Sequence, residues 1–194
     1  MALSYTKIKV EVREILLRRR PSELYAISSK GTVPVLYLVN QTVIDESLDI
    51  MIWALQHSKK NTWLNLHFDK QMQIIAKNDN EFKYWLDRYK YFDRYPENTK
   101  EYYREKCNVY LISLENMLKE NYYLFCKSIL LADVAIFPFI RQYANIDSEW
   151  FGSNYKNLNN WLNQILNSSL FISVMIKYDE YVKNQAPLIT NFKN

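Results

Sequence analysis

The chain has 194 residues, of which 48% are hydrophobic and 24% are charged, and its formal net charge is +4. This composition is typical of a globular protein with one domain of ordinary size or two small ones, and so small a positive charge indicates no nucleic-acid surface. No apolar run reaches the roughly 20 residues that span a bilayer, and the N-terminus lacks a signal-peptide pattern, so we predict a cytoplasmic protein without a membrane segment.

The N-terminal residues predict the end of a helix followed by a strand. Met1–Tyr5 is apolar enough for a last helical turn, and apolar residues then alternate with charged ones. Such a period of two is typical of a strand with one buried face, which we place at Lys9–Leu16. Pro21 favours the start of a short helix, which we expect to end near Ser28.

The next stretch predicts a hairpin and a helix start. Val35–Val39 is a β-rich apolar run, Thr42–Ile44 is a candidate returning strand, and Asn40-Gln41 between them is a plausible two-residue turn. A helix should begin at Asp45 or Glu46, because acidic side chains suit the positive end of the helix dipole.

From about Gln56 to Trp63 the sequence is polar and without apolar periodicity, which indicates a linker. Helical patterns follow, and a turn is predicted at 150–152. The predicted helices are Asp69–Tyr91 as one bent helix or two, Glu97–Glu120 opened by Pro96, a buried helix within Ser128–Phe139, Tyr155–Leu166 and Leu170–Tyr181. We predict that the polar tail beyond them lacks order.

Residues that carry metal or nucleotide chemistry are scarce. With only two glycines in the chain, no dinucleotide-binding or phosphate-binding loop is predicted. His57 and His67 have no partner at metal-ligand spacing, and Cys107 and Cys126 form no CxxC pair. We therefore predict no metal site and two reduced core thiols.

Two motifs carry a resemblance to a known family. Thr32-Val33-Pro34-Val35-Leu36 precedes the first hairpin strand, and Asp45-Glu46-Ser47-Leu48 opens the next helix. Together they resemble the glutathione-binding half of the glutathione S-transferase family. The resemblance implies a thioredoxin-like α/β domain over residues 1–56, incomplete at its N-terminus, and an all-helical domain over residues 64–194. It also implies glutathione as co-substrate, a small apolar electrophile or disulfide as partner, and a homodimer.

The resemblance assigns roles to six residues. In the family the Val-Pro bond is cis, and the valine backbone meets the cysteinyl part of glutathione like an added strand. Helix N-terminal amides and Ser47 would bind the γ-glutamyl carboxylate, and Glu46 its ammonium. Arg20, just before a proline, would meet the glycyl carboxylate. The residues expected to bind glutathione are Val33, Pro34, Glu46, Ser47, Arg20 and Lys30.

The resemblance also shows a departure. In the family a first strand and half a helix precede the segment that matches Met1–Tyr5, and they carry the Ser, Cys or Tyr that activates the thiol. The catalytic residue of this chain is therefore unknown. A thioredoxin-like sheet without that strand leaves backbone groups unpaired. We expect either that Met1 is internal to a longer parent protein or that the strand at Lys9–Leu16 pairs directly with the hairpin.

A second departure concerns the buried helix of the helical domain. The family places an Asp three residues after a Ser or Thr N-cap; here Asp133 is present, but position 130 is Leu. We expect Ser128 to serve instead, with a shifted helix start, and Pro138 to kink or break the helix. This motif concerns folding, so the departure bears on stability.

The aromatic residues of the second half allow two interpretations. Leu86–Pro96 is similar to a stretch of bacterial glutathione S-transferase-like proteins. Its rings could line a pocket for an apolar electrophile or simply pack in the core, and core packing is the commoner role. Two functions stay open as well: an enzyme that transfers glutathione to an electrophile or reduces a mixed disulfide, and a non-catalytic binding or interaction protein with the same fold.

Overall fold

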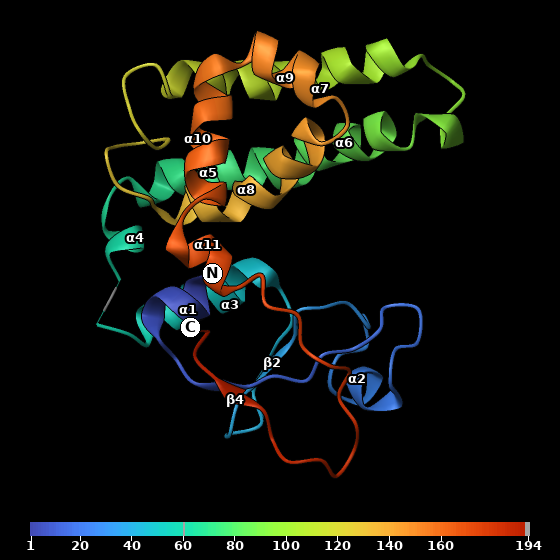
Figure 1. The fold of residues 1–194 in the computed structure, drawn as a ribbon, viewed down its shortest axis with the longest axis vertical. Coiled ribbons are helices and arrows are strands. Elements are labelled where there is room, and N and C mark those ends of the chain that lie inside the picture. Colours follow the sequence, from blue (N-terminus) through green and yellow to red (C-terminus); the bar gives the residue numbers. More distant parts are fainter. Residues whose placement is uncertain (60, 193–194) are drawn as a thin grey trace. The chain divides into compact units, whose positions relative to one another are not determined.

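The computed structural model describes residues 1–59 and 61–192, and it divides into two compact units (Figure 1). The first unit combines Met1–Asn61 with the residues from Ser169 onward, and the second is Thr62–Ser168. The C-terminal residues therefore belong to the first unit, whereas the sequence analysis placed them with the helices. None of the helices in the described part of the chain has the length and apolar character needed to cross a membrane.

The first unit is a small α/β arrangement built from both ends of the chain. Its elements are α1 (Ala2–Thr6), β1 (Val10–Glu11), α2 (Ser22–Ile27), β2 (Leu36–Tyr37), β3 (Val43–Ile44), α3 (Ser47–Gln56), α11 (Ser169–Ser173) and β4 (Ile189–Thr190). The sequence correctly predicted the positions of α1 and α2. It also predicted the start of α3 to within two residues. The strands are shorter than predicted, because regular pairing covers only two residues in each.

The hairpin prediction is confirmed. β2 and β3 are antiparallel, with Leu36 opposite Ile44 and Tyr37 opposite Val43. Beyond the ladder, the Leu38 N–H donates to the Thr42 carbonyl at 2.9 Å. Leu38 therefore lies opposite Thr42, and the loop between them has three residues, 39–41, so the predicted two-residue turn at Asn40-Gln41 is wrong. Gln41 ends the loop with φ of 68°, the left-handed conformation that is common at the last position of three-residue hairpin loops.

The prediction that the first strand pairs with this hairpin is wrong. β1 pairs antiparallel with β4, and β2 with β3, in two separate two-stranded sheets within the described residues. The prediction of a tail without order is wrong for the same reason, since β4 lies in that tail. A strand edge needs backbone partners, and local sequence does not show which distant segment supplies them.

The core of the first unit lies between α1 and α3, which pack against each other. Ala2 on α1 is buried, as are Ile50, Ala54 and Leu55 on α3. The last two are fully buried, at 0% exposure. This packing fixes the direction of α3, whose N-terminus carries Glu46 and Ser47.

The second unit is all-helical. Its elements are α4 (Thr62–Asn65), α5 (Phe68–Lys77), the π-helical turn η1 (Asn78–Phe82), α6 (Lys83–Lys90), the 3-10 turn η2 (Phe92–Arg94), α7 (Lys100–Met117), α8 (Leu131–Ala144), α9 (Ser148–Asn154) and α10 (Lys156–Leu166). α5, η1 and α6 follow one another without a break, so the predicted bent helix is one continuous helix with a π turn, a common site of helix bending.

Two helix boundaries differ from the prediction. α7 begins at Lys100 rather than at Pro96, because the Thr99 hydroxyl accepts a hydrogen bond from the Tyr102 N–H at 3.2 Å and caps the helix there. Residues 150–152 lie inside α9 and do not form a turn. The Asp147 carboxylate caps that helix by accepting from the Trp150 N–H at 3.0 Å.

Many of the large aromatic residues of this unit form its core. The aromatic side chains with less than 2% exposure are Trp63, Phe82, Tyr89, Tyr103, Phe137, Tyr143, Phe151 and Trp161. Several rings meet at tilted or edge-to-face angles, such as Phe137 and Trp161 with centroids 6.2 Å apart, an arrangement that aromatic pairs prefer. The core-packing interpretation of the aromatic residues is therefore confirmed for this set.

The buried helix α8 begins at Leu131 with Leu130 as N-cap, so the prediction that Ser128 caps it is wrong. The Leu130 side chain makes no capping hydrogen bond, and the Asp133 carboxylate accepts from the backbone at the helix start instead. Its Oδ2 accepts from the Leu130 N–H at 2.9 Å, and its Oδ1 accepts from the Leu124 N–H at 3.0 Å and the Trp161 Nε1–H at 2.8 Å. The fully buried Asp133 thus joins the loop before α8, α8 itself and α10.

Candidate functional site

The first part of the site is the turn that leads into β2. Gly31 has φ of +60°, and a Cβ there would lie 2.3 Å from Cε1 of Tyr25 on α2. Only glycine combines this left-handed conformation with so close a ring. Two residues further on, the Val33–Pro34 peptide bond is cis, as the resemblance implied. Val33 is 45% exposed, so its backbone is near the surface.

The second part is a network of charged and polar side chains that ties this turn to the start of α3. The Ser28 hydroxyl donates to Asp45 Oδ2 at 2.8 Å. Lys30 Nζ lies 3.0 Å from Asp45 Oδ1 and 2.5 Å from Glu46 Oε1. Two carboxylates and one ammonium therefore meet in one exposed cluster.

The pKa values of this cluster follow its hydrogen bonds. Those from Lys30 to Glu46 and then to Asp45 raise the pKa of the Lys30 ammonium. The hydrogen bond from Ser28, followed by that from Lys30, lowers the pKa of the Asp45 carboxyl. Both shifts favour the charged forms of Lys30 and Asp45, and the Glu46 side chain lies beside them where it can accept hydrogen bonds from an ammonium group.

The third part is the N-terminus of α3. Glu46 is the N-cap residue, and its side chain makes no capping hydrogen bond. The first amides of a helix have no partner within the helix, and the helix dipole makes this end positive. Ser47, the first helical residue, adds an exposed hydroxyl. This end of α3 suits a carboxylate, next to the anionic Glu46 side chain.

Hairpin geometry brings the two motifs to the same end of the β2–β3 pair. Leu36 lies opposite Ile44 at the open end of the hairpin. Val33 comes three residues before Leu36, and Ser47 comes three residues after Ile44, so both residues lie beyond that end. Lys30 precedes Val33 by three residues, which span at most about 11 Å. Since Lys30 contacts Glu46, the cis turn and the α3 N-terminus lie within reach of one small peptide.

Arg20 is not brought into this cluster. It is exposed and precedes Pro21, the N-cap residue of α2. In the described part of the chain it makes no ion pair with Asp45 or Glu46, and the ion pair at this turn joins its neighbour Arg19 to Glu180 at 2.8 Å. The structure therefore groups Val33, Pro34, Lys30, Glu46 and Ser47, and leaves Arg20 outside.

Sequence reasoning missed two members of the network. Asp45 was recognised only as part of a helix start, although it shares Lys30 with Glu46. Ser28 lies 17 residues before its partner Asp45, and no spacing rule links the two positions. The neighbouring acidic pair Asp45-Glu46 was the one available signal that a cation belongs at this helix start.

A thioredoxin-like α/β unit with a helical unit, and a cis Val-Pro turn beside an acidic helix start, is the arrangement of glutathione S-transferases. The model of the glutathione S-transferase N-terminal domain matches residues 1–62, and that of the C-terminal domain matches residues 69–169. The chain belongs to the glutathione S-transferase family. The predicted family and fold class are thereby confirmed.

Solved structures agree on the fold. A glutathione S-transferase from Methylobacillus flagellatus KT with glutathione bound has a TM-score of 0.72 at 17% identity, over 88% of this chain and 89% of that one. The bacterial glutathione S-transferase BphK in a ternary complex has a TM-score of 0.72 at 17% identity, over 89% and 88%. The transferase URE2P6 from Phanerochaete chrysosporium, in complex with oxidised glutathione, has a TM-score of 0.68 at 17% identity, over 79% and 76%. A comparison with curated proteins found no significant match.

Proposed function

We propose that this protein binds glutathione at the cluster defined by Val33, Pro34, Lys30, Glu46 and Ser47, and that it transfers glutathione to an electrophile or reduces a mixed disulfide. The observation that supports the proposal is the convergence of the Val33–Pro34 turn and the Glu46–Ser47 helix start at one end of a hairpin. Two solved structures with the same fold contain glutathione or its oxidised form.

The chemistry of the cluster matches one end of the tripeptide. The γ-glutamyl group carries a carboxylate and an ammonium on the same carbon. The positive α3 N-terminus and the Ser47 hydroxyl suit the carboxylate, while the Glu46 side chain suits the ammonium. The exposed backbone at Val33 suits the peptide portion, which can pair with it as an added strand. Lys30 is the cation within this cluster, and its ammonium pairs with Glu46.

A second function is favoured by what the cluster does not supply. Its members suit the charged head and the backbone of glutathione, but none is assigned to the thiol. Transferase chemistry needs a group that lowers the thiol pKa so that the thiolate forms near neutral pH. A binding or interaction protein that holds glutathione without activating it is therefore the alternative.

Isothermal titration calorimetry tests the proposed site, with glutathione, S-methylglutathione and glutathione acetylated on its γ-glutamyl amine as titrants. We expect the first two to bind with similar affinity, because the cluster is proposed to contact the γ-glutamyl group and the peptide backbone of glutathione, and these are the same in both. The acetylated form should bind at least about 10-fold more weakly, since Glu46 loses a charged partner. Absence of binding by glutathione would overturn both functions.

Activity separates the two functions once binding is established. Turnover of an aryl halide or of a glutathione mixed disulfide supports the enzyme, and binding without turnover of either supports the alternative. A homodimer and a small apolar second substrate are part of the same proposal, by analogy with the family. Light scattering on the eluted peak of a size-exclusion column measures the oligomeric state directly.

A further inference from the structure

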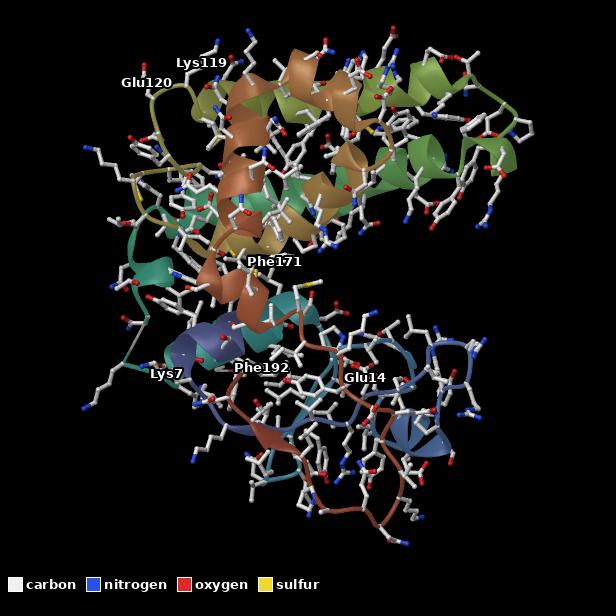
Figure 2. All side chains as sticks on the ribbon, viewed as in Figure 1. Lys7, Glu14, Lys119, Glu120, Phe171 and Phe192 are labelled. Carbon is white, nitrogen blue, oxygen red and sulfur yellow. The ribbon has the colours of Figure 1, made fainter. Side chains whose placement is uncertain are left out.

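The C-terminal segment of the first unit covers one edge of β1. β4 pairs with β1 so that Val10 lies opposite Thr190 and Glu11 opposite Ile189. The Val12 N–H donates to the Leu188 carbonyl at 2.9 Å, and further along the Tyr181 N–H donates to the Glu14 carbonyl at 2.8 Å. In Figure 1 the red C-terminal segment runs beside the blue N-terminal strand, and Figure 2 labels Glu14 and Phe192 on the two.

All of these contacts use the same edge of β1. Backbone amide and carbonyl groups of a strand point to alternate sides, so Val10 and Val12 face the same way, and Glu14 contacts the segment beyond the ladder through its own bridge to Glu180. Within the segment Glu180–Thr190, residues 188–190 pair antiparallel with residues 10–12, and Glu180 forms a separate parallel bridge with Glu14. An edge without such a partner is open to pairing with another extended chain.

Side chains hold the segment through polar contacts at the surface. Arg19 pairs with Glu180 at 2.8 Å, where the two side chains are 73% and 35% exposed. Lys183 lies 3.6 Å from Glu23, and both side chains are more than half exposed. The Arg13 guanidinium lies 4.9 Å from the centre of the Tyr181 ring. Exposed ion pairs of this kind contribute little.

The segment has no buried anchor. No residue between 174 and 192 is buried, and the apolar side chains of Val182 and Ile189 are 62% and 56% exposed. Segments with few buried apolar contacts and solvent-exposed backbone hydrogen bonds open at the lowest free-energy cost in a protein. The segment is thus held by backbone hydrogen bonds together with side-chain contacts at the surface, and not by buried apolar side chains.

We propose that the β1 edge formed by Val10, Val12 and Glu14 is a strand-accepting surface, and that its occupant, Glu180–Thr190, is releasable and can be replaced by the same segment of a second copy of this chain. The edge already pairs with residues 188–190 in antiparallel register and bridges Glu180 at Glu14, and a segment that pairs within its own chain fits the same edge of another. This interaction surface is separate from the glutathione cluster, so the two proposals stand or fall independently.

A peptide copy of the segment tests the proposal on the full chain. The probe is a fluorescent peptide of residues 178–192, YDEYVKNQAPLITNF, and the measurement is fluorescence anisotropy. The ladder turns the amides of Leu188 and Thr190 toward β1 and that of Ile189 away. N-methylation at Thr190 should therefore weaken binding at least about 10-fold, whereas N-methylation at Ile189, the matched control, should leave it unchanged.

A variant of the chain tests whether the resident segment competes. Glu180→Gln removes the ion pair with Arg19, so the segment opens more often and the intact peptide should bind about 2- to 5-fold more tightly. Lys183→Gln is the control, because its longer ion pair is more exposed. The proposal is overturned if the unmodified peptide does not bind, if both N-methylated peptides bind equally, or if Glu180→Gln leaves the affinity unchanged.

Discussion

Replacing Asp133 by alanine lowers the free energy of unfolding by about 3–5 kcal/mol. The carboxylate is fully buried and accepts hydrogen bonds from the Leu124 N–H, the Leu130 N–H and the Trp161 indole N–H. Alanine would leave three buried donors without an acceptor, and each costs about 1–3 kcal/mol. Urea unfolding followed by tryptophan fluorescence measures the loss.

Asp147→Ala is the matched control for this prediction. Asp147 also caps a helix, but it is exposed and accepts from one amide only, that of Trp150. Its loss should cost about 1 kcal/mol, because water can replace the carboxylate at the surface. Equal losses for the two variants would contradict the view that Asp133 joins three buried elements.

The same carboxyl group makes stability depend on pH. Burial raises the pKa of Asp133 to about 6, although its three hydrogen bonds oppose the shift. The folded state then binds the proton more tightly than the unfolded chain, whose Asp has a pKa of about 3.9. The contribution of this group to stability is therefore fully present below about pH 4, and about 2–3 kcal/mol is lost as the pH rises to about 6. The difference between wild type and Asp133→Asn, measured from pH 4 to 7, should show this slope.

Much of the fold could be predicted from local sequence patterns. The hairpin, the short α2 and the start of α3 follow from turn residues, β-rich runs and acidic residues at a helix start, all of which act within a few positions. The same is true of the long helices, whose apolar spacing gives their buried faces. The family resemblance added the order of the two units, which single elements do not determine.

Partners that are distant in sequence explain what was missed. β1 is covered by residues about 180 positions later, such as Thr190 opposite Val10, and two-residue strands leave hardly any periodic signal. Leu130 stands at an N-cap position that local rules assign to a polar residue. There the buried Asp133 supplies the hydrogen bond, and only the packed structure shows that three separate segments depend on it.

The sequence predicted the two motifs of the candidate site but not the contact that links them, because that contact joins residues that are distant in sequence. The two motifs are continuous in sequence, and their hairpin places both at one end. The link between them is the Lys30 side chain, which contacts Asp45 and Glu46. Such a contact depends on how the turn at Gly31 folds over Tyr25, and no spacing rule describes that fold. Arg20, chosen because the family pattern has a cationic residue just before a proline at this place, lies outside the cluster.

Glu46→Ala should weaken the binding of glutathione by about 10- to 100-fold, because the ligand ammonium loses its only assigned anionic partner and a charge-assisted hydrogen bond contributes about 1.5–3 kcal/mol. In the free protein the Glu46 carboxylate already holds Lys30 Nζ at 2.5 Å. The ligand ammonium must therefore share Glu46 with Lys30 or displace it, and removal of Glu46 leaves Lys30 on Asp45 alone. Calorimetry on the purified variant measures the change in Kd.

Asp49→Ala is the control that separates a direct contact from a general change of charge. Asp49 is acidic, exposed and in the first turn of the same helix, so its removal changes the net charge equally. Asp49 makes no contact with Lys30 in the described structure. We expect the Kd of the Asp49→Ala variant for glutathione to stay within about 2-fold of wild type, since exposed charges are screened by solvent and salt. If both variants weaken binding equally, Glu46 acts only through the field at the helix N-terminus. If neither does, the ammonium of glutathione binds elsewhere, and the assignment of Glu46 is wrong.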